Sequence, residues 1–105
     1  MRFNRRNWDK FFDGSNKQTT IRLKKSKIGH HKAYTAGSYY NPVILGEFDI
    51  VKIDERNWNI LTEQDGVDDG FSGVIELRNE LKKINGIIEG NTKLYKHWIE
   101  NAVKL

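Results

Sequence analysis

One segment of the chain, residues 43–53, limits the possible folds more than any other. It reads Val-Ile-Leu-Gly-Glu-Phe-Asp-Ile-Val-Lys-Ile and is rich in β-branched and aromatic residues, the types that favour strands. Asn41-Pro42 marks a turn just before it, and Gly46 inside it predicts a β-bulge. We therefore expect a central strand on which the rest of the chain builds a sheet.

Three further segments are predicted to contribute to this sheet. In residues 19–24 apolar and polar side chains alternate, which places Thr20 and Arg22 together on one face. Residues 93–104 contain Trp, Ile and Val, which favours a closing strand, with a helix as the alternative. Residues 26–40 are interpreted as strand and turn.

Helical patterns lie on both sides of the central strand. Residues 5–13 carry aromatic residues at helical spacing, with Asn4 as the N-cap and Gly14 as the stop. After the central strand we expect one helical turn over residues 61–65. A longer helix should follow over residues 73–84, capped by Ser72 and ended by Asn85-Gly86. The order helix, strands, two helices, strand indicates one α+β domain, residues 1–105, with a small barrel-like sheet of five to six strands.

The charge is distributed unevenly along the chain. Residues 1–34 carry ten Lys and Arg against two Asp, whereas residues 35–76 carry two basic residues against nine acidic ones. A basic N-terminal third favours a polyanion such as RNA as partner. The alternative is that the two oppositely charged regions pair with each other. The sequence leaves both interpretations open.

Several classes of site are excluded or not expected. The chain contains no cysteine, which excludes disulfides, thiolate metal sites and cysteine nucleophiles. His30 and His31 are adjacent and so face opposite sides of a strand, while His97 is isolated; we expect no metal and no cofactor. With no signal peptide and no membrane-length apolar run, we expect a cytoplasmic monomer with no membrane partner.

The residues best suited to chemistry lie in a basic segment, residues 14–25, between the first predicted helix and strand. Lys17 precedes a strand face that carries a hydroxyl and a guanidinium. Such a set can bind an anion. It can also activate a hydroxyl nucleophile if burial lowers the pKa of the lysine. A surface lysine and an ordinary strand threonine are the alternative. The predicted ligand-binding cations are Arg22, Lys24 and Lys25.

Tyrosines follow this basic segment. Tyr34, Tyr39 and Tyr40 lie close together in the sequence, and aromatic side chains near basic ones can stack on bases of RNA. We expect Tyr39 to contact a ligand in this way. Ordinary packing inside a barrel is the alternative for all three.

Two patches of the chain resemble the ASCH family, which has a PUA-like β-barrel fold. Residues 14–22 are similar to its Gly-x-Lys-x-x-Thr-x-Arg signature, with one extra residue between the glycine and the lysine. Leu61-Thr62-Glu63, followed by Asp69-Gly70-Phe71 and the helix after it, resembles a second segment of the family. Residues 45–53 resemble its central barrel strand. The resemblance covers most of the chain and keeps the order of the family's motifs.

The resemblance implies a protein directed at RNA or a modified nucleoside, with a basic and polar cleft beside its short helices. Some members are amidohydrolases that remove the acetyl group from N4-acetylcytidine, and others are RNA-binding proteins or ribonucleases. The catalytic lysine and threonine fall on Lys17 and Thr20. The catalytic acid falls on Asp69, where the amidohydrolases have glutamate; an ordinary turn before a helix is the other interpretation of Asp69. RNA or nucleoside binding is the first expectation, and hydrolysis is the alternative.

Overall fold

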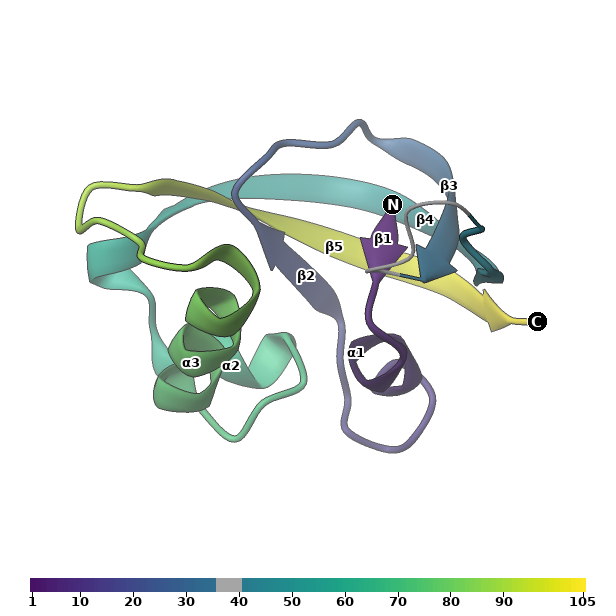
Figure 1. Cartoon of the computed structure of the whole chain (residues 1–105), viewed down its shortest axis with the longest axis horizontal. Helices are drawn as coiled ribbons and strands as arrows, with labels where there is room; N and C mark the ends of the chain where they lie inside the picture. Colours follow the sequence, from purple (N-terminus) through teal and green to yellow (C-terminus); the bar gives the residue numbers. More distant parts are fainter. Residues whose placement is uncertain (36–40) are drawn as a thin grey trace.

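The computed structural model describes residues 1–35 and 41–105, so the predicted contact of Tyr39 lies outside the described residues. One mixed sheet with the strand order β1-β3-β4-β5-β2 curls into a half-barrel (Figure 1). β1 pairs in parallel with β3, and the other three pairings are antiparallel. The strands are β1 (Arg2–Phe3), β2 (Thr19–Arg22), β3 (Gly29–Thr35), β4 (Ile44–Asn57) and β5 (Lys93–Lys104).

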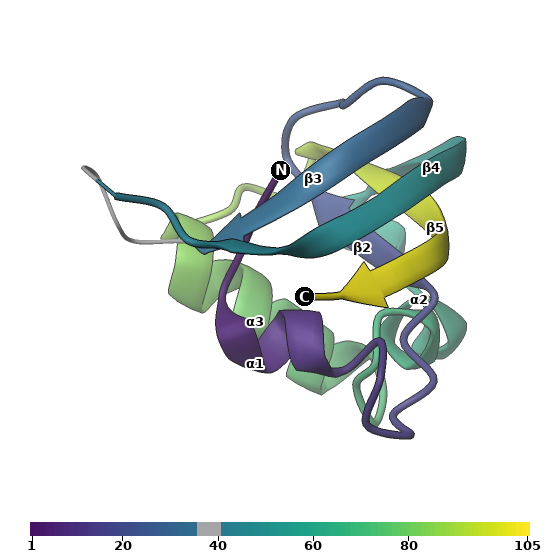
Figure 2. The same ribbon diagram turned by 90° about the vertical axis from the view of Figure 1, so that its right-hand side faces the viewer.

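The helices lie together on one side of this sheet in both views (Figures 1 and 2). They are α1 (Arg5–Asp9), the 3-10 turn η1 (Trp58–Ile60), α2 (Glu63–Asp68) and α3 (Val74–Asn85). None of these described helices is long and apolar enough to cross a membrane. The predicted α+β class with a small barrel-like sheet is therefore confirmed.

Long strands with irregular register give the sheet its curvature. The segment predicted as the central strand is the middle of β4, which continues to Asn57 and pairs with β5 along most of its length. Ala33 of β3 pairs with Gly46, but Tyr34 pairs with Ile44, so β4 contains one extra residue beside the predicted bulge. A side chain at Gly46 would collide with the carbonyl of Val103 and with the indole of a buried tryptophan, so only glycine fits there.

Two clusters of buried apolar side chains stabilise the domain. One joins α1 to β1, β3, β4 and part of β5, and the other joins η1, α3 and the loops on either side of α2 to β2 and β5. The members of the first are Phe3, Trp8, Ala33, Leu45, Phe48, Ile50 and Ile99. The members of the second are Ile21, Trp58, Leu61, Phe71, Leu77, Leu81 and Leu94.

The predicted helix ends agree with the structure in part. Asn4 caps α1 as expected, since its Oδ1 accepts from the Asn7 amide at 2.8 Å. The helix ends at Asp9 and not at residue 13, because residues 10–13 continue as hydrogen-bonded turns. α3 begins one residue later than predicted, with Gly73 at the N-cap. The hydroxyl of Ser72 donates instead to the Glu76 carboxylate at 2.6 Å.

Candidate functional site

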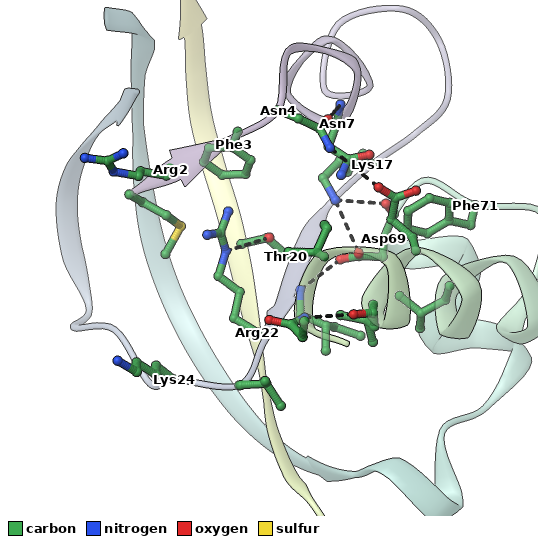
Figure 3. A pocket seen from close by; sticks show the side chains of 18 of the residues that line it. Arg2, Phe3, Asn4, Asn7, Lys17, Thr20, Arg22, Lys24, Asp69 and Phe71 are labelled. Atoms are coloured by element: carbon green, nitrogen blue, oxygen red, sulfur yellow. Dashed lines mark hydrogen bonds and ion pairs between the residues drawn. The ribbon is translucent and has the colours of Figure 1, made fainter. Parts of the chain in front are cut away.

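A cavity of about 450 Å³ opens between the two apolar clusters. Its walls come from β1, α1, the loop before β2, β2 itself, the C-terminal end of α2, and α3. The volume lies within the range of roughly 300–1,000 Å³ of small-molecule sites. Five residues singled out from the sequence contribute to its lining, namely Lys17, Thr20, Arg22, Lys24 and Asp69 (Figure 3).

Lys17 and Asp69 meet at one side of this cavity. Lys17 Nζ donates to the carbonyl oxygen of Asp69 at 2.9 Å and lies 3.4 Å from its carboxylate Oδ2. The two side chains are only 2% and 7% exposed. Aspartate therefore reaches this lysine despite being one methylene shorter than the glutamate that the ASCH amidohydrolases carry.

The backbone and hydroxyl groups of β2 hold Asp69 in place. Its other carboxylate oxygen, Oδ1, accepts from Thr19 Oγ1 at 3.0 Å and from the amide of Ile21 at 3.1 Å. Asp69 caps the C-terminus of α2 and is followed by Gly70 at φ 88°, which redirects the chain toward α3. The predicted turn at this point thus forms and also delivers the carboxylate to the cavity.

Burial shifts the pKa values of this pair in opposite directions. Loss of solvent lowers the pKa of the Lys17 ammonium, and the Asp69 carboxylate opposes this shift. Loss of solvent likewise raises the pKa of Asp69, and the charge of Lys17 opposes that shift. Both shifts bring the pKa values closer together, so that a proton passes from lysine to aspartate at a lower free-energy cost than in water. A neutral lysine amine is the form that acts as a base.

Thr20 and Arg22 lie side by side on the face of β2 that the alternation predicted. Arg22 Nε donates to Thr20 Oγ1 at 3.1 Å, and the hydroxyl oxygen is the acceptor in this contact. Burial lowers the pKa of Arg22 to about 10, and the side chain therefore remains a cation at neutral pH. In Figure 3 Thr20 is drawn between Arg22 and the Lys17–Asp69 pair.

His97 of β5 fixes the backbone around Thr20. Its Nε2 accepts from the amide of Ser26 at 3.0 Å, so its Nδ1 carries the proton and donates to the Thr20 carbonyl at 3.0 Å. Burial lowers the pKa of His97, which favours this neutral form. The sequence indicated a packed histidine; its role in holding one wall of the cavity was not predicted.

A second buried ionic cluster positions the helix that carries Asp69. Lys96 Nζ of β5 contacts Asp65 Oδ1 at 2.9 Å and Asp68 Oδ2 at 2.7 Å, and its side chain is 2% exposed. Arg56 of β4 adds a contact to Asp65 at 3.1 Å. Nothing in the local sequence pattern indicated this cluster, because its members meet only when β4 pairs with β5 and α2 lies against these strands.

The remaining predicted residues are placed differently. Lys24 lines the cavity and is exposed, whereas Lys25 is exposed and is not among the lining residues. The N-terminal segment contributes residues that the sequence did not suggest. Arg2 and Phe3 enter the lining because β1 pairs with β3, and Asn7 enters it from α1. A two-residue strand has too little pattern to be recognised from sequence.

Among the described residues, the lining holds two carboxylates, those of Asp69 and Glu80, and no histidine. Within residues 1–35 and 41–105, no group of three or more His, Asp or Glu side chains is arranged to hold a metal ion. The groups that the described cavity residues offer for chemistry are therefore an amine, two hydroxyls, two carboxylates, asparagine amides and several cations.

A comparison of the chain with protein-family models gives no match, and neither does a comparison with curated proteins. The resemblance to the ASCH family therefore remains a prediction, and functional proposals depend on the geometry of the cavity.

Proposed function

We propose that the protein is an amidohydrolase that acts on a nucleoside of the N4-acylated cytidine class in the cavity of Lys17, Thr20 and Asp69. One observation carries this proposal: Lys17 and Thr20 of one segment and Asp69, 52 positions after Lys17, converge on one cavity of about 450 Å³. Two of them form a buried ion pair, which is an expensive arrangement. The arrangement suits an enclosed small ligand better than an open RNA surface.

The reaction uses the shifted pKa values of the pair. Neutral Lys17 takes the proton of the Thr20 hydroxyl as its oxygen attacks the acyl carbon. The proton then passes to the departing N4 nitrogen, so that cytidine is released and an acyl ester remains on Thr20. Water, deprotonated by Lys17, hydrolyses the ester to the free acid and restores the hydroxyl. Asp69 orients the lysine and lowers the cost of moving its proton.

The test is release of cytidine from N4-acetylcytidine, followed by liquid chromatography. We expect the protein to form cytidine, and Lys17→Ala and Thr20→Ala to reduce kcat/KM by at least about 10²-fold, since removing one of the groups that act as a unit costs as much or more. Lys27→Ala and Thr92→Ala are matched controls, because neither residue lines the cavity. The proposal fails if no cytidine forms, or if it still forms at the wild-type rate in both active-site variants.

RNA binding is a second candidate function. The observation that favours it is the excess of cations around the cavity: Arg2, Arg22 and the exposed Lys24 line it together with Lys17. Charge reversal at Lys24 should then weaken binding of a short single-stranded RNA and reduce the slope of log K against log salt by about one per lost contact. Fluorescence anisotropy at several salt concentrations measures this, and an unchanged slope argues against RNA binding at the cavity.

A further inference from the structure

Among the described residues, Arg22 makes no direct ion pair with a carboxylate, whereas Lys17, which lines the same cavity, pairs with Asp69. The two carboxylates of the lining are both engaged: Asp69 pairs with Lys17, and Glu80 pairs with Arg6 at 3.1 Å. In the described part of the chain, no carboxylate lies within ion-pair distance of Arg22. The charge of Asp69 acts on Arg22 from beyond ion-pair distance and offsets only part of the cost of burying it. A bound anion in direct contact would offset more of that cost.

The guanidinium of Arg22 is already oriented for such an anion. Its Nε is held by Thr20 Oγ1 at 3.1 Å, and its Cζ lies 4.5 Å from the centre of the Phe3 ring. A hydrogen bond along one edge and a ring beside the group fix its plane. The two terminal nitrogens are left to donate, and this parallel pair of donors matches two oxygens of a phosphate. Figure 3 shows the group at the Arg2 side of the cavity.

The surroundings of Arg22 strengthen the preference for an anion. Arg2 and Lys24 line the same cavity, as does Met1. Burial and then the charge of Arg22 lower the pKa of the Met1 ammonium, because like charges disfavour each other. The cationic side of the cavity lies away from Lys17 and Asp69, which face it across Thr20 in Figure 3.

We propose that the ligand of this cavity is a nucleoside monophosphate, with its phosphate on Arg22 and its base toward Lys17 and Asp69. This inference depends on the proposed nucleoside chemistry and specifies its substrate class. Phosphate is the anionic substituent that nucleosides commonly carry. Its oxygens accept the parallel donors of a guanidinium, whereas an unphosphorylated nucleoside would leave Arg22 without an anion in direct contact.

Isothermal titration calorimetry with cytidine and cytidine 5′-monophosphate tests the inference, at low and at moderate salt. We expect the monophosphate to bind the wild-type protein more tightly by roughly 10- to 100-fold, the gain typical of a charge-assisted hydrogen-bonded pair. In Arg22→Gln the ratio of the two dissociation constants should fall to about one. Arg22→Lys keeps the charge but not the parallel pair of guanidinium donors, and it should give an intermediate ratio. Lys27→Gln removes an exposed cation outside the lining and should keep the wild-type ratio.

The possible outcomes separate the inference from the proposed function. If cytidine and its monophosphate bind equally, while N4-acetylcytidine is still hydrolysed, the phosphate site is wrong and the hydrolase stands. If inorganic phosphate alone displaces the monophosphate at equal concentration, the site is a bare anion site and the inference fails. If a short RNA binds while neither small ligand does, both proposals fail in favour of RNA. If the ratio of the dissociation constants of cytidine and its monophosphate is the same in Arg22→Gln as in Lys27→Gln, Arg22 does not contact the phosphate and the inference fails.

Discussion

The Lys17–Asp69 ion pair places two charged groups in the cavity, and burying these charges carries a cost in folding free energy. Each side chain is almost fully buried, and each depends on the other for its charge. Removing one partner leaves an uncompensated buried charge. Replacing both, with asparagine at position 69, leaves no buried charge and keeps an oxygen that accepts from Thr19 and Ile21. The pair is therefore expected to be more important for specificity and chemistry than for net stability.

Lys17→Met should lower the free energy of unfolding by about 3–5 kcal/mol, because the Asp69 carboxylate is left buried without its cation. The double variant Lys17→Met/Asp69→Asn should lose less than Lys17→Met alone, since the asparagine oxygen still accepts from β2. Urea denaturation monitored by tryptophan fluorescence measures both. Losses that add independently would show that the two side chains are not coupled.

His97 should make stability depend on pH. Burial lowers its pKa in the folded protein, so the unfolded chain binds its proton more readily. Its contribution is fully present above the unfolded pKa of about 6.5 and is lost as the pH falls from there toward the lowered folded value. His97→Gln should therefore lose less stability between pH 7 and pH 5 than the wild-type protein does, as measured by urea unfolding across that range.

His30 supplies the opposite control. Hydrogen bonds to Asp49 and Glu47 raise its pKa, so any stability it adds is present below the unfolded value and is lost as the pH rises through the folded one. The side chain is 58% exposed, which keeps this effect small. The variant His30→Gln should still lose folding stability below pH 6.5, as the wild-type protein does. A flatter profile in this variant would contradict the assignment to His97.

The position of α2 depends on strand residues far away in the sequence. Six residues are too few for a helix to be stable alone, and α2 relies on its Thr62–Asp65 capping box and on Lys96. Because Asp69 directly follows the helix, the placement of α2 sets the placement of the carboxylate. Lys96 acts on the site through this helix and is a positioning residue.

Lys96→Met should lower the free energy of unfolding by about 3–5 kcal/mol, since two buried carboxylates lose their shared cation. Arg56→Met is the matched control: Arg56 contacts the same Asp65 but is 30% exposed, so its loss should stay near 1 kcal/mol. Urea unfolding compares the two. Equal losses of unfolding free energy in the two variants would mean that Lys96 does not contribute more than Arg56 to the stability of this ionic cluster.

The close approach of β4, β5 and α1 at Gly46 is similarly intolerant of change. A methyl group there would meet the Val103 carbonyl and the Trp8 indole. Gly46→Ala should cost at least about 1–3 kcal/mol, the usual range for overpacking. At Gly14 a methyl group would meet open space, and only the positive φ is unfavourable, so Gly14→Ala should cost about 1 kcal/mol. Thermal denaturation ranks the two, and the reverse order would contradict the packing argument.

For the molecule as a whole, the sequence predicts the features that depend on neighbouring residues. It misses the contacts that depend on the pairing of distant strands. The helix cap at Asn4, the alternation of β2 and the long central strand all follow from short-range spacing. The convergence of Lys17 with Asp69 was predicted only through the resemblance, since 52 positions separate them. The Lys96 cluster and the entry of Arg2 into the cavity were missed, because both depend on strand register.

The uneven charge distribution also finds its explanation only in the assembled molecule. The basic first third and the acidic middle meet in Lys17–Asp69 and in Lys10–Glu76, as one of the two sequence interpretations expected. Arg22 keeps no such partner among the described residues, so the cavity retains positive charge as the other interpretation required. Internal pairing and a cationic cavity thus coexist in one small domain.

The pairing of β2 with β5 has a consequence for the order of folding. Thr19 to Arg22 are paired with Trp98 to Tyr95, so the strand that carries Thr20 and Arg22 is held by residues far away in the sequence, such as His97, 77 positions after Thr20. Pairings that distant are slow to form, because the loop entropy is lost before the contacts are gained. Any intermediate in which β5 is still unpaired therefore lacks the wall of the cavity that carries Thr20 and Arg22, and the cavity forms only after β5 has paired with β2.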